Sequence, residues 1–496
     1  MNWGLAQTFE MKPAEITNAH LQNQSCDPFT PAARPCELGN YATYSINVTG
    51  AQDVVAGMRF AQQHNIRMVI KTSGHDYMGK STGFGALSLW MWNLKTADII
   101  SNYTGTGYSG PAMKVGSGTV SGEALQVAAQ AGYRLVGGEC ASVGLGAGYT
   151  QGGGHSILSS AYGLAADSVL EWEVVTAQGQ HLVASPEQNA DLYWALSGGG
   201  GGTYGVVLSM TVRLYPDGPV AGGSLSFNLT DSGNNETLFW HGVELWHRHL
   251  PSLVADNNTV LYNVENNTLG IFAFTLPDQH VGTLESLVSP FLAQLEEWGI
   301  SYVLETEASA SYVDHFNKYF GPLPYGAEPI TMMSSRMVPR SVILDPTANT
   351  GLVDTLRSIV SGGEFLVGCN ALNVANGGSL LANAVLPAWR DTIALCAINA
   401  FLNYTAPLSQ NIAAKKEMVN IHVPALEAAT PGSGVYLNEV DPLYEGDWKQ
   451  TMYGSNYDSL LQVKQLYDPG CLLYAQFAVG SDEYTIDDSG RLCRKE

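Results

Sequence analysis

The sequence predicts an α+β protein of two domains, with a C-terminal segment that returns to the first domain. A chain of 496 residues is too long for one simple core. Short strands alternate with helices and glycine-rich loops up to Pro216, and longer amphipathic helices begin after Asp217. The earlier pattern returns at Gly434. We therefore expect four parts: an N-terminal segment (1–35), a first domain (36–216), a second α+β domain (217–433) and a returning segment (434–496).

The elements of the first domain follow from the spacing of apolar residues. Helical spacing predicts helices at 51–64, 121–131 and 188–196. Buried or alternating apolar runs predict strands at 66–70, 86–92, 112–115 and 206–214, and a hairpin formed by 169–177 and 181–184. In the last strand, leucine, methionine and valine alternate with polar residues, which indicates one buried face and one polar face.

The second domain and the returning segment contain fewer glycine clusters. We expect helices at 236–253, 281–298 and 413–429, and a strand at 269–276. In the returning segment we expect a short strand at 435–440 and a helix at 457–467. Asp468-Pro469-Gly470 should end that helix, because proline cannot continue it.

The charge of the chain excludes two classes of partner. The net charge is −22 and the sequence pI is near 4.8. Nucleic acid and anionic membranes require a basic patch, so we expect neither as a partner. No apolar run approaches the roughly 18 residues that a membrane helix needs. A small-molecule substrate remains the expected partner.

Glycosylation signals indicate the secretory route. The tripeptide Asn-x-Ser/Thr occurs at Asn23, Asn47, Asn102, Asn228, Asn235, Asn257, Asn266 and Asn403. Residues 1–20 lack a basic start followed by an apolar core, so we expect that any signal peptide has been removed. The interpretation is a mature, secreted (extracellular) protein with N-linked glycans, and we expect a monomer.

The seven cysteines are compatible with an oxidising compartment. If Cys140 serves a ligand, six remain, and they can pair in 15 ways. A disulfide between Cys26 and Cys36 would cross-link the N-terminal segment, and one between Cys471 and Cys493 would close the C-terminal tail. The last two are Cys369 and Cys396, which are either buried free thiols or a third bridge.

Two glycine-rich loops carry the chemistry of the first domain. One runs from Lys71 to Ser81 around His75, and the other from Gly137 to Gly148 around Cys140. Glycine lets backbone N–H groups approach a flat, phosphorylated ligand, and imidazole and thiolate are the nucleophiles suited to bond an electrophilic cofactor. Rossmann, P-loop, zinc and serine-hydrolase motifs are not supported by the spacing. Taken alone, His75 also fits a hydrogen-bonded loop histidine, and Cys140 half of a disulfide.

These loops resemble those of the berberine-bridge-enzyme-like flavoprotein oxidases, in the vanillyl-alcohol-oxidase superfamily and of a secreted fungal type. The matching segments are Ser73-Gly74-His75-Asp76-Tyr77, Gly138–Gly144, Tyr162–Asp167, Gly199–Val207, Asn456–Leu460 and Tyr467-Asp468-Pro469. They span residues 36–215 and 434–480. The chain departs from the family in three places: a glycine is missing before His75, Ala141 replaces proline and Ser459 replaces arginine.

The resemblance implies a two-lobed FAD-binding domain and a bicovalent FAD. The 8α-methyl carbon would be bonded to His75 (8α-histidyl) and C6 to Cys140 (6-S-cysteinyl), and both bonds favour hydride uptake by the ring. The FAD-binding residues that we expect are His75, Cys140, Thr72, Ser73, Gly74, Asp76, Tyr77, Gly116, Ser117, Gly118, Gly138, Ser142, Gly144, Gly148, Gly152, Gly205, Val206 and Asn456.

The resemblance also places catalytic groups. Val143 stands where the family has a residue that gates dioxygen, and valine there is typical of oxidases. Tyr436-Leu437-Asn438-Glu439 resembles the strand that presents polar groups to the flavin. Period-two geometry puts Tyr436 and Asn438 on one face and Glu439 on the other. We expect Tyr436 as base or phenolate and Asn438 as a positioning residue, with Glu439 as the alternative base; His155 is either a structural histidine or a second layer around the flavin.

The predicted function is a secreted FAD-dependent oxidase. Hydride would pass from an alcohol, carbohydrate-like or phenolic small molecule to FAD, and O2 would be reduced to hydrogen peroxide. Two alternatives remain: a dehydrogenase that uses a quinone-type acceptor, and a decayed secreted protein that only binds flavin or sugar. The substrate is not encoded in a motif, although four aromatic residues of the second domain either line a site or belong to the core: Trp240, Trp246, Tyr312 and Tyr319.

Overall fold

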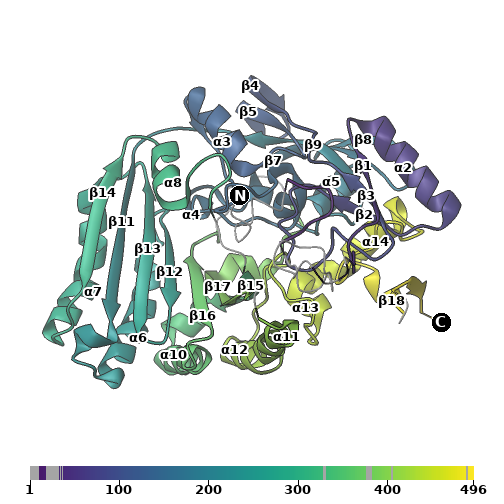
Figure 1. Cartoon of the computed structure of the whole chain (residues 1–496). Coiled ribbons are helices and arrows are strands. Elements are labelled where there is room, and N and C mark those ends of the chain that lie inside the picture. Colours follow the sequence, from purple (N-terminus) through teal and green to yellow (C-terminus); the bar gives the residue numbers. More distant parts are fainter. Residues whose placement is uncertain are drawn as a thin grey trace.

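The structure is a computed structural model that describes residues 11–17, 33, 35, 37–327, 331–375, 382–403, 406–487 and 490–495. Within these residues the strands form sheets of three, five and seven strands and two short two-stranded ribbons. The two smaller sheets and the C-terminal segment make one lobe, and the seven-stranded sheet with its helices makes the other (Figure 1). The predicted α+β class with two lobes is confirmed.

The N-terminal sheet is a parallel sheet with the strand order β1-β3-β2. Its strands are β1 (Tyr44–Asn47), β2 (Met68–Lys71) and β3 (Leu87–Trp90), and helix α2 (Ala51–His64) is the crossover from β1 to β2. Val54, Met58 and Ala61 lie three or four residues apart, so they form one buried stripe on α2. The predicted helix 51–64 matches α2, and β2 leads directly into the His75 loop.

The central sheet is antiparallel, with the order β4-β5-β9-β7-β8. The predicted hairpin and the strand after Gly205 are confirmed, but all residues of β9 are buried because it is the middle strand, whereas we expected one polar face. The edge strand β4 was missed because its side chains are largely polar and exposed. The elements of this layer are β4 (Ala97–Gly105), β5 (Tyr108–Gly116), α3 (Ser121–Gln130), β7 (Val169–Val175), β8 (His181–Ala184), α5 (Ala190–Leu196) and β9 (Val206–Arg213).

The large sheet has the order β14-β11-β13-β12-β16-β17-β15 and is antiparallel. Helices α6, α7, α10 and α12 lie along its outer side (Figure 1). The bounds are β11 (Val220–Asn228), α6 (Glu236–Leu253), β12 (Thr259–Val264), β13 (Thr268–Pro277), α7 (Val281–Glu297), β14 (Val303–Ser309), α8 (Tyr312–Phe320), β15 (Thr331–Pro339), α9 (Arg340–Leu344), α10 (Pro346–Val360), β16 (Leu366–Ala371) and β17 (Thr392–Phe401).

The helix expected at 413–429 is not continuous. It consists of α11 (Leu408–Glu417), a π-helical turn (Met418–His422) and α12 (Val423–Ala429). Pro424 has no backbone N–H, so the regular α-helical hydrogen bonding is interrupted in the turn before it.

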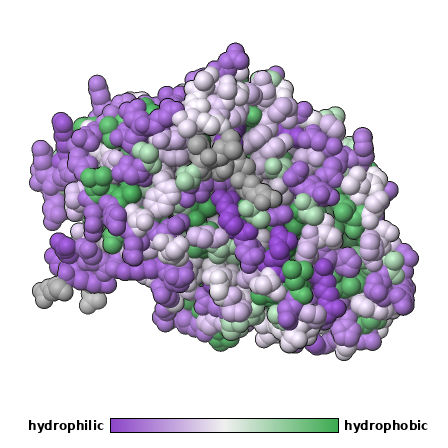
Figure 2. All heavy atoms as spheres, turned by 180° about the vertical axis from the view of Figure 1, so that it is seen from behind, coloured by the Kyte–Doolittle hydropathy of each residue, from purple (hydrophilic) through white to green (hydrophobic). Residues whose placement is uncertain are grey.

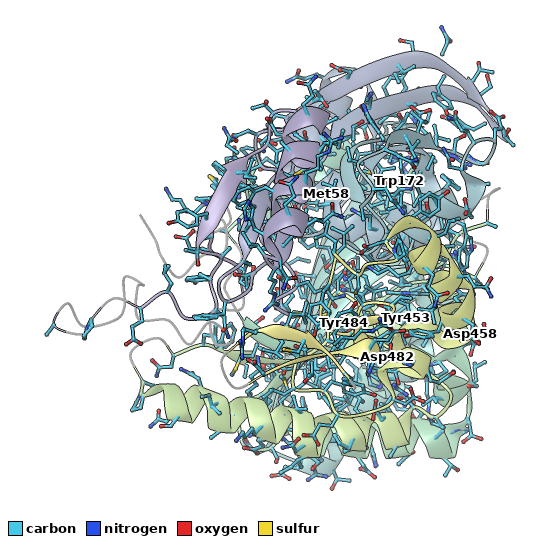
Figure 3. The ribbon with its side chains drawn as sticks, turned by 90° about the vertical axis from the view of Figure 1, so that its right-hand side faces the viewer. Met58, Trp172, Tyr453, Asp458, Asp482 and Tyr484 are labelled. Atoms are coloured by element: carbon cyan, nitrogen blue, oxygen red, sulfur yellow. A yellow bond between two sulfur atoms is a disulfide. The ribbon has the colours of Figure 1, made fainter. Side chains whose placement is uncertain are left out.

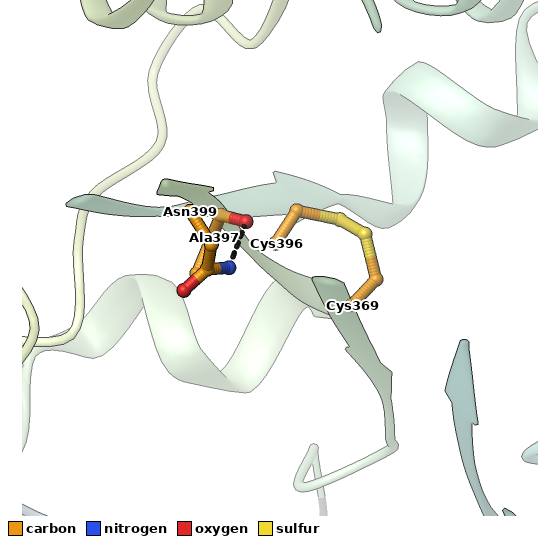
Figure 4. Close-up of a disulfide and its surroundings, with 4 residues drawn as sticks. All are labelled: Cys369, Cys396, Ala397 and Asn399. Carbon is orange, nitrogen blue, oxygen red and sulfur yellow. Dashed lines mark hydrogen bonds between the residues drawn. A yellow bond between two sulfur atoms is a disulfide. The ribbon is translucent and has the colours of Figure 1, made fainter. Parts of the chain in front are cut away.

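Cross-strand pairing decides one of the open cysteine questions. Cys369 of β16 faces Cys396 of β17 in the register of the sheet, and the two form a disulfide (Figure 4). The predicted Cys471–Cys493 bridge is wrong, because both thiols are free and Cys493 pairs with Thr485 in the hairpin of β18 (Tyr484–Ile486) and β19 (Leu492–Arg494). The predicted Cys26–Cys36 pair lies outside the described residues.

The C-terminal segment returns to the first lobe, where it forms α13 (Trp448–Tyr453) and α14 (Tyr457–Tyr467). The Tyr457 hydroxyl donates to the Asp482 carboxylate at 2.8 Å, and the Tyr453 hydroxyl to the Phe477 carbonyl at 2.8 Å. Figure 3 shows Tyr453 and Asp482 within this segment, beside the layers that carry Met58 and Trp172. These bonds fold the segment onto itself at the surface of the first lobe.

The strand expected at 435–440 is wrong. The backbone does run beside β15, since Ser335 N–H donates to the Glu439 carbonyl and Met337 N–H to the Gly434 carbonyl, at 2.7 and 2.9 Å. However, Glu439 N–H donates to the Tyr436 carbonyl at 2.9 Å, which closes a turn. Period-two alternation therefore does not apply to residues 436–439.

Polar residues dominate the rear face of the molecule (Figure 2). Figure 2 shows a mainly hydrophilic rear face on which hydrophobic residues form small, separate groups. No helix among the described residues is long and apolar enough to cross a membrane. Asn23 lies outside the described residues and Asn228 is half-buried, while the sequon asparagines with exposed side chains are Asn47, Asn102, Asn235, Asn257, Asn266 and Asn403.

A buried lysine joins the C-terminal segment to the first lobe. Lys464 of α14 donates to the Asp468 carboxylate at 2.7 Å and to the carbonyls of Thr203 and Leu473 at 2.8 and 2.9 Å. Lys464 and Asp468 are both almost fully buried. A buried ammonium with three acceptors holds its geometry only while every partner is present.

Replacing Lys464 by methionine should destabilise the protein strongly. Asp468 would be left buried without its cation, so we expect the free energy of unfolding to fall by about 3–5 kcal/mol. Lys449→Met is the matched control, because Lys449 pairs with Asp482 at the surface and should contribute less than about 1 kcal/mol. Equal shifts of the two variants in denaturant titrations would contradict this assignment.

Candidate active site

A cavity of about 440 Å³ lies between the two lobes. Its wall combines the two glycine-rich loops, residues 201–207, one face of the large sheet and the turn at 436–439. This volume is within the range of about 300–1,000 Å³ that small-molecule and cofactor sites occupy. Both sequence-predicted loops therefore meet in one place.

The His75 loop is held by the side chain that follows the histidine. The Asp76 carboxylate accepts hydrogen bonds from the backbone N–H groups of Met78, Gly79 and Ser81, at 3.0, 2.9 and 2.7 Å. The Ser81 hydroxyl adds a fourth bond at 2.6 Å. Asp76 therefore fixes the loop from within, and His75 is presented to the cavity.

Side chains connect the His75 loop to the Cys140 loop. His75 Nε2 lies 2.8 Å from the Ser142 hydroxyl, and Gly144 N–H donates to the Ser73 hydroxyl at 3.0 Å. On the other side, the N-terminus of α3 holds the second loop, since Ser121 N–H donates to the Val143 carbonyl at 2.9 Å. His75 and Cys140, which are 65 residues apart in the sequence, consequently line the same cavity.

Two glycines show why the wall excludes larger residues. Gly74 has a φ of +86°, a left-handed conformation that side chains rarely adopt. A Cβ atom on Gly201 would stand 2.7 Å from the Cα of Gly148, so two stretches of backbone touch directly. The result is a wall of bare backbone on which a flat ligand has room to lie.

Most of the expected FAD-binding residues line the cavity. They are Thr72, Ser73, Gly74, His75, Asp76, Tyr77, Ser117, Gly138, Cys140, Gly144, Gly148 and Gly205, and Val143 joins them. Five others stand behind this wall, namely Gly116, Gly118, Ser142, Gly152 and Val206. Asn456 donates instead to the carbonyls of Ala384 and Val385, at 3.2 and 3.1 Å.

Three of the glycines behind the wall are required by close packing of the chain. A Cβ on Gly116 or Gly118 would collide with the carbonyls of Leu94 or Trp92, and one on Gly152 would collide with the Asn438 amide. Their glycine identity thus reflects close packing of the chain. Sequence reasoning assigned them to the ligand because a glycine that lines a cavity and one that supports its wall look the same in a sequence.

The three expected catalytic residues of the C-terminal turn all line the cavity. Asn438 Nδ2 donates to the Tyr436 hydroxyl at 2.7 Å and to the Gly148 carbonyl at 2.9 Å. The expected placement of Glu439 on the opposite face is wrong, because the turn brings it to the same side. Burial raises the pKa of the Tyr436 phenol, and the Glu439 carboxylate adds to the rise.

His155 lies between two carboxylates inside this cavity. Its Nε2 is 2.9 Å from Glu439 Oε1, and its Nδ1 is 3.2 Å from Glu139 Oε1. Burial opposes the charged imidazole, but both carboxylates favour it and raise the pKa of His155 to about 10. Its ring also stands edge-on to Tyr436, with centroids 5.1 Å apart. His155 is therefore a cavity residue, and Glu139, which we did not predict, belongs to the same cluster.

The aromatic residues considered for substrate binding lie elsewhere. Trp246 and Tyr312 are almost completely buried, and Trp240 and Tyr319 pack with the same core, so none of the four lines the cavity. The helical spacing of these four aromatic residues therefore reflects packing in the core and not substrate binding. The aromatic side chains that do line the cavity are Tyr77, Tyr149, Phe272, Phe401, Tyr436 and Tyr474.

Comparisons with known proteins agree with this geometry. A family model described as "FAD binding domain" matches residues 42–185, and one described as "Berberine and berberine like" matches residues 435–478. The bifunctional decalin synthase calF of Penicillium decumbens is 50% identical over 99% of this chain and 86% of its own. The chain belongs to the berberine-bridge-enzyme-like, vanillyl-alcohol-oxidase-type FAD-linked oxidoreductases.

Solved structures share the fold of this chain. The VAO-type flavoprotein oxidase VAO615 of Thermothelomyces thermophilus is 48% identical over 97% of this chain and 83% of its own. The crystal structure of MtVAO615 from Myceliophthora thermophila superposes with a TM-score of 0.96 over 99% of this chain and 90% of that chain, at 47% identity. A glucooligosaccharide oxidase from Acremonium strictum, described with a 6-S-cysteinyl, 8α-N1-histidyl FAD, is 17% identical and shares the fold with a TM-score of 0.72 over 88% of this chain and 92% of that chain.

The residues present fit FAD. The wall of bare backbone accepts a flat ring, and two nucleophilic side chains, His75 and Cys140, reach the same cavity. The FAD-linked oxidoreductases of this family bind FAD, and the described cavity brings both nucleophiles to one wall.

The charge of His155 predicts how stability depends on pH. The pKa of this histidine is higher in the folded protein, at about 10, than its ordinary value of about 6.5. Its stabilising effect is therefore complete below about pH 6.5 and is lost as the pH rises through about 10, by up to about 1.4 kcal/mol per pH unit. Melting temperatures of the wild type should fall across this window.

The His155→Gln variant should lack this pH-dependent fall. His181→Gln is the matched control, because His181 also contacts a glutamate, Glu173 at 2.9 Å, but is exposed. A wild-type profile parallel to that of His155→Gln between pH 6.5 and 10 would contradict the buried charge.

Proposed function

We propose that the protein is a secreted oxidase that transfers hydride from a small organic molecule to covalently bound FAD and passes the electrons to O2, with release of hydrogen peroxide. One observation carries the proposal: two nucleophiles suited to hold FAD share a cavity with an acid–base cluster. His75 and Cys140 are the two nucleophiles, and Tyr436 and Glu439 are the acid–base groups, with Asn438 hydrogen-bonded to Tyr436.

Two side chains would hold the cofactor. His75 would form the 8α-histidyl bond and Cys140 the 6-S-cysteinyl bond. The Ser142 hydroxyl, 2.8 Å from Nε2, holds the imidazole ring in one orientation. The double attachment of FAD in the glucooligosaccharide oxidase of the same fold supports this assignment.

FAD, when bound, supplies a hydride acceptor, and the chain must supply a group that takes the accompanying proton. We propose Glu439, the alternative considered from the sequence, as that base in place of Tyr436. The raised pKa keeps the Tyr436 phenol protonated, so it acts as a hydrogen-bond donor to the substrate oxygen. Asn438 orients the phenol through its 2.7 Å bond, and His155 holds the Glu439 carboxylate at 2.9 Å.

The choice of O2 as acceptor rests on Val143 and on the relatives. Val143 lines the cavity and is a small residue at the position where the family admits dioxygen. The VAO615 relative, 48% identical, is itself named an oxidase. The retained acid–base cluster argues for an active enzyme and against a decayed binding protein, and a quinone acceptor remains the second enzyme hypothesis.

We also propose secretion, N-glycosylation and a monomeric state. Six of the predicted sequon asparagines have exposed side chains, as glycan transfer requires. The Cys369–Cys396 disulfide fits an oxidising compartment. A mainly hydrophilic outer face fits a single chain in solution (Figure 2).

The covalent attachment is tested by acid denaturation. Wild-type protein should retain its flavin absorbance in the precipitate, and so should His75→Ala and Cys140→Ala, each through the remaining bond. The double variant should release the flavin to the supernatant. Asp76→Asn, which weakens the loop but keeps both nucleophiles, is the control and should stay yellow. Yellow colour entirely in the wild-type supernatant would refute the double attachment.

The base is tested by two conservative variants. Glu439→Gln should lower kcat by about 10²–10⁴-fold, because it removes the proton acceptor without changing the shape of the side chain. Tyr436→Phe should lower kcat less and mainly raise KM. The measurement is anaerobic reduction of the flavin by any substrate that the wild type oxidises. A larger loss of kcat in Tyr436→Phe than in Glu439→Gln would identify Tyr436 as the base.

A further inference from the structure

One face of the large sheet forms part of the cavity wall. Because side chains alternate along a strand, residues two apart on β12, β15, β16 and β17 point to this face. They are Leu261 and Asn263, Thr331 and Met333, Leu366, Gly368 and Asn370, and Ala397, Asn399 and Phe401, to which β13 adds Phe272. The residues between them, such as Val367 and Ile398, pack into the core on the other side.

Among these described residues, none has an ionisable side chain. The polar ones are three amides and one threonine, and two of the amides, Asn263 and Asn399, lie beside a glycine. A Cβ atom on Gly368 would stand 3.2 Å from Asn263 Oδ1 and 3.6 Å from Asn399 Nδ2. The amides and the missing side chain make a small polar hollow that suits a neutral oxygen atom.

The polar hollow meets the cluster of Glu139, His155 and Glu439 at one residue. The side-chain amide of Asn370 lies 3.4 Å from His155 Nδ1. The two carboxylates of that cluster, Glu139 and Glu439, are already paired with the imidazole. An oxygen atom held by Asn370 would therefore lie beside His155, on the side of the imidazole that contacts Glu139, in the cavity that Glu439 also lines.

Aromatic side chains stand at the outer part of the same face. Phe272 and Phe401 line the cavity and yet are 42% and 59% exposed. Met333 and Leu366 are half-buried and line the same wall. Exposed apolar side chains that line a pocket indicate a ligand with apolar surface, because the ligand removes them from water.

We infer that the substrate is a neutral, mainly apolar molecule with one carbonyl or hydroxyl oxygen at the end that reacts. The amides around Gly368 and Asn370 hold that oxygen, and the apolar body lies along Leu366 towards Phe272 and Phe401. This inference rests on the proposed function and narrows its substrate class.

Carbohydrates and amines fit this wall poorly. A sugar carries a hydroxyl on almost every carbon, and each hydroxyl buried against Phe272, Phe401 or Leu366 would lose its hydrogen bonds to water. A protonated amine would meet only neutral groups on the sheet face. Of the substrates expected from the sequence, this wall favours an apolar alcohol, with the ketone as its oxidised form, over a carbohydrate-like molecule.

The test uses the flavin-loaded holoenzyme and three probes. The first two, 4-phenylbutan-2-one and 4-phenylbutan-2-amine, share a carbon skeleton and differ in charge at neutral pH; cellobiose is the third. Binding is read as a saturable change in flavin absorbance. We expect the ketone to bind, the amine to bind at least about tenfold more weakly, and cellobiose to cause no change.

Variants then locate the probe. Phe272→Ser and Phe401→Ser should each weaken ketone binding by about three- to tenfold, because each removes apolar contact area. Phe60→Ser is the matched control, since Phe60 is 48% exposed on α2 and does not line the cavity. Asn370→Asp should make the amine bind more tightly than the ketone, because it places a negative charge on the neutral face.

Several outcomes would overturn the inference: an amine that binds as tightly as the ketone, a response to cellobiose equal to that of the ketone, no response to any probe, or equal effects of the Phe60 and Phe401 variants. The proposed function fails separately. Photoreduced holoenzyme mixed with O2 reports the acceptor without any substrate, so slow reoxidation would refute the oxidase while probe binding stood.

Discussion

One imidazole joins the three segments that build the active site. Glu139 comes from the Cys140 loop, His155 follows the glycine turn at 152–154, and Glu439 belongs to the C-terminal turn. Two carboxylates this close in a buried place repel each other unless a cation lies between them. The positive charge of His155 removes that repulsion, so the C-terminal segment can approach the first lobe. The position of Glu439 in the cavity wall depends on this contact.

The same contact explains why the chain must return to its first domain. Glu439 lies far along the sequence from the loop that it contacts, and a second buried ion pair, Lys464 with Asp468, fixes the following helix against the Thr203 carbonyl. The returning segment thus closes the cavity from one side, while the large sheet closes it from another. A domain boundary drawn by sequence position alone would separate groups that act together.

The sequence predicted much of this arrangement. Helices such as Ala51–His64, Glu236–Leu253 and Tyr457–Tyr467 were located because their apolar stripes and end signals are local. The His75 and Cys140 loops were found from their glycine content and their nucleophilic side chains, and their role towards FAD was inferred from the resemblance to a family. The sequence did not predict that Glu439 faces the cavity together with Tyr436 and Asn438, because residues 436–439 form a turn where a strand was expected. The Glu139–His155–Glu439 cluster could not be found either, since its three members are joined only in space.

The neutral, partly apolar character of the sheet face that lines the cavity follows from how the large sheet packs, which no sequence motif encodes. In β16 the side chains alternate between half-buried Leu366, Gly368 and Asn370 and fully buried residues that face the helices. The sequence shows this alternation, but it does not show which face looks at the cofactor loops. Only the packing of the large sheet against the first lobe makes the amides a binding surface and leaves Phe272 and Phe401 at its exposed edge. Substrate choice in this protein is thus set by which face of a sheet is turned inward, and the chemistry by the loops that it meets.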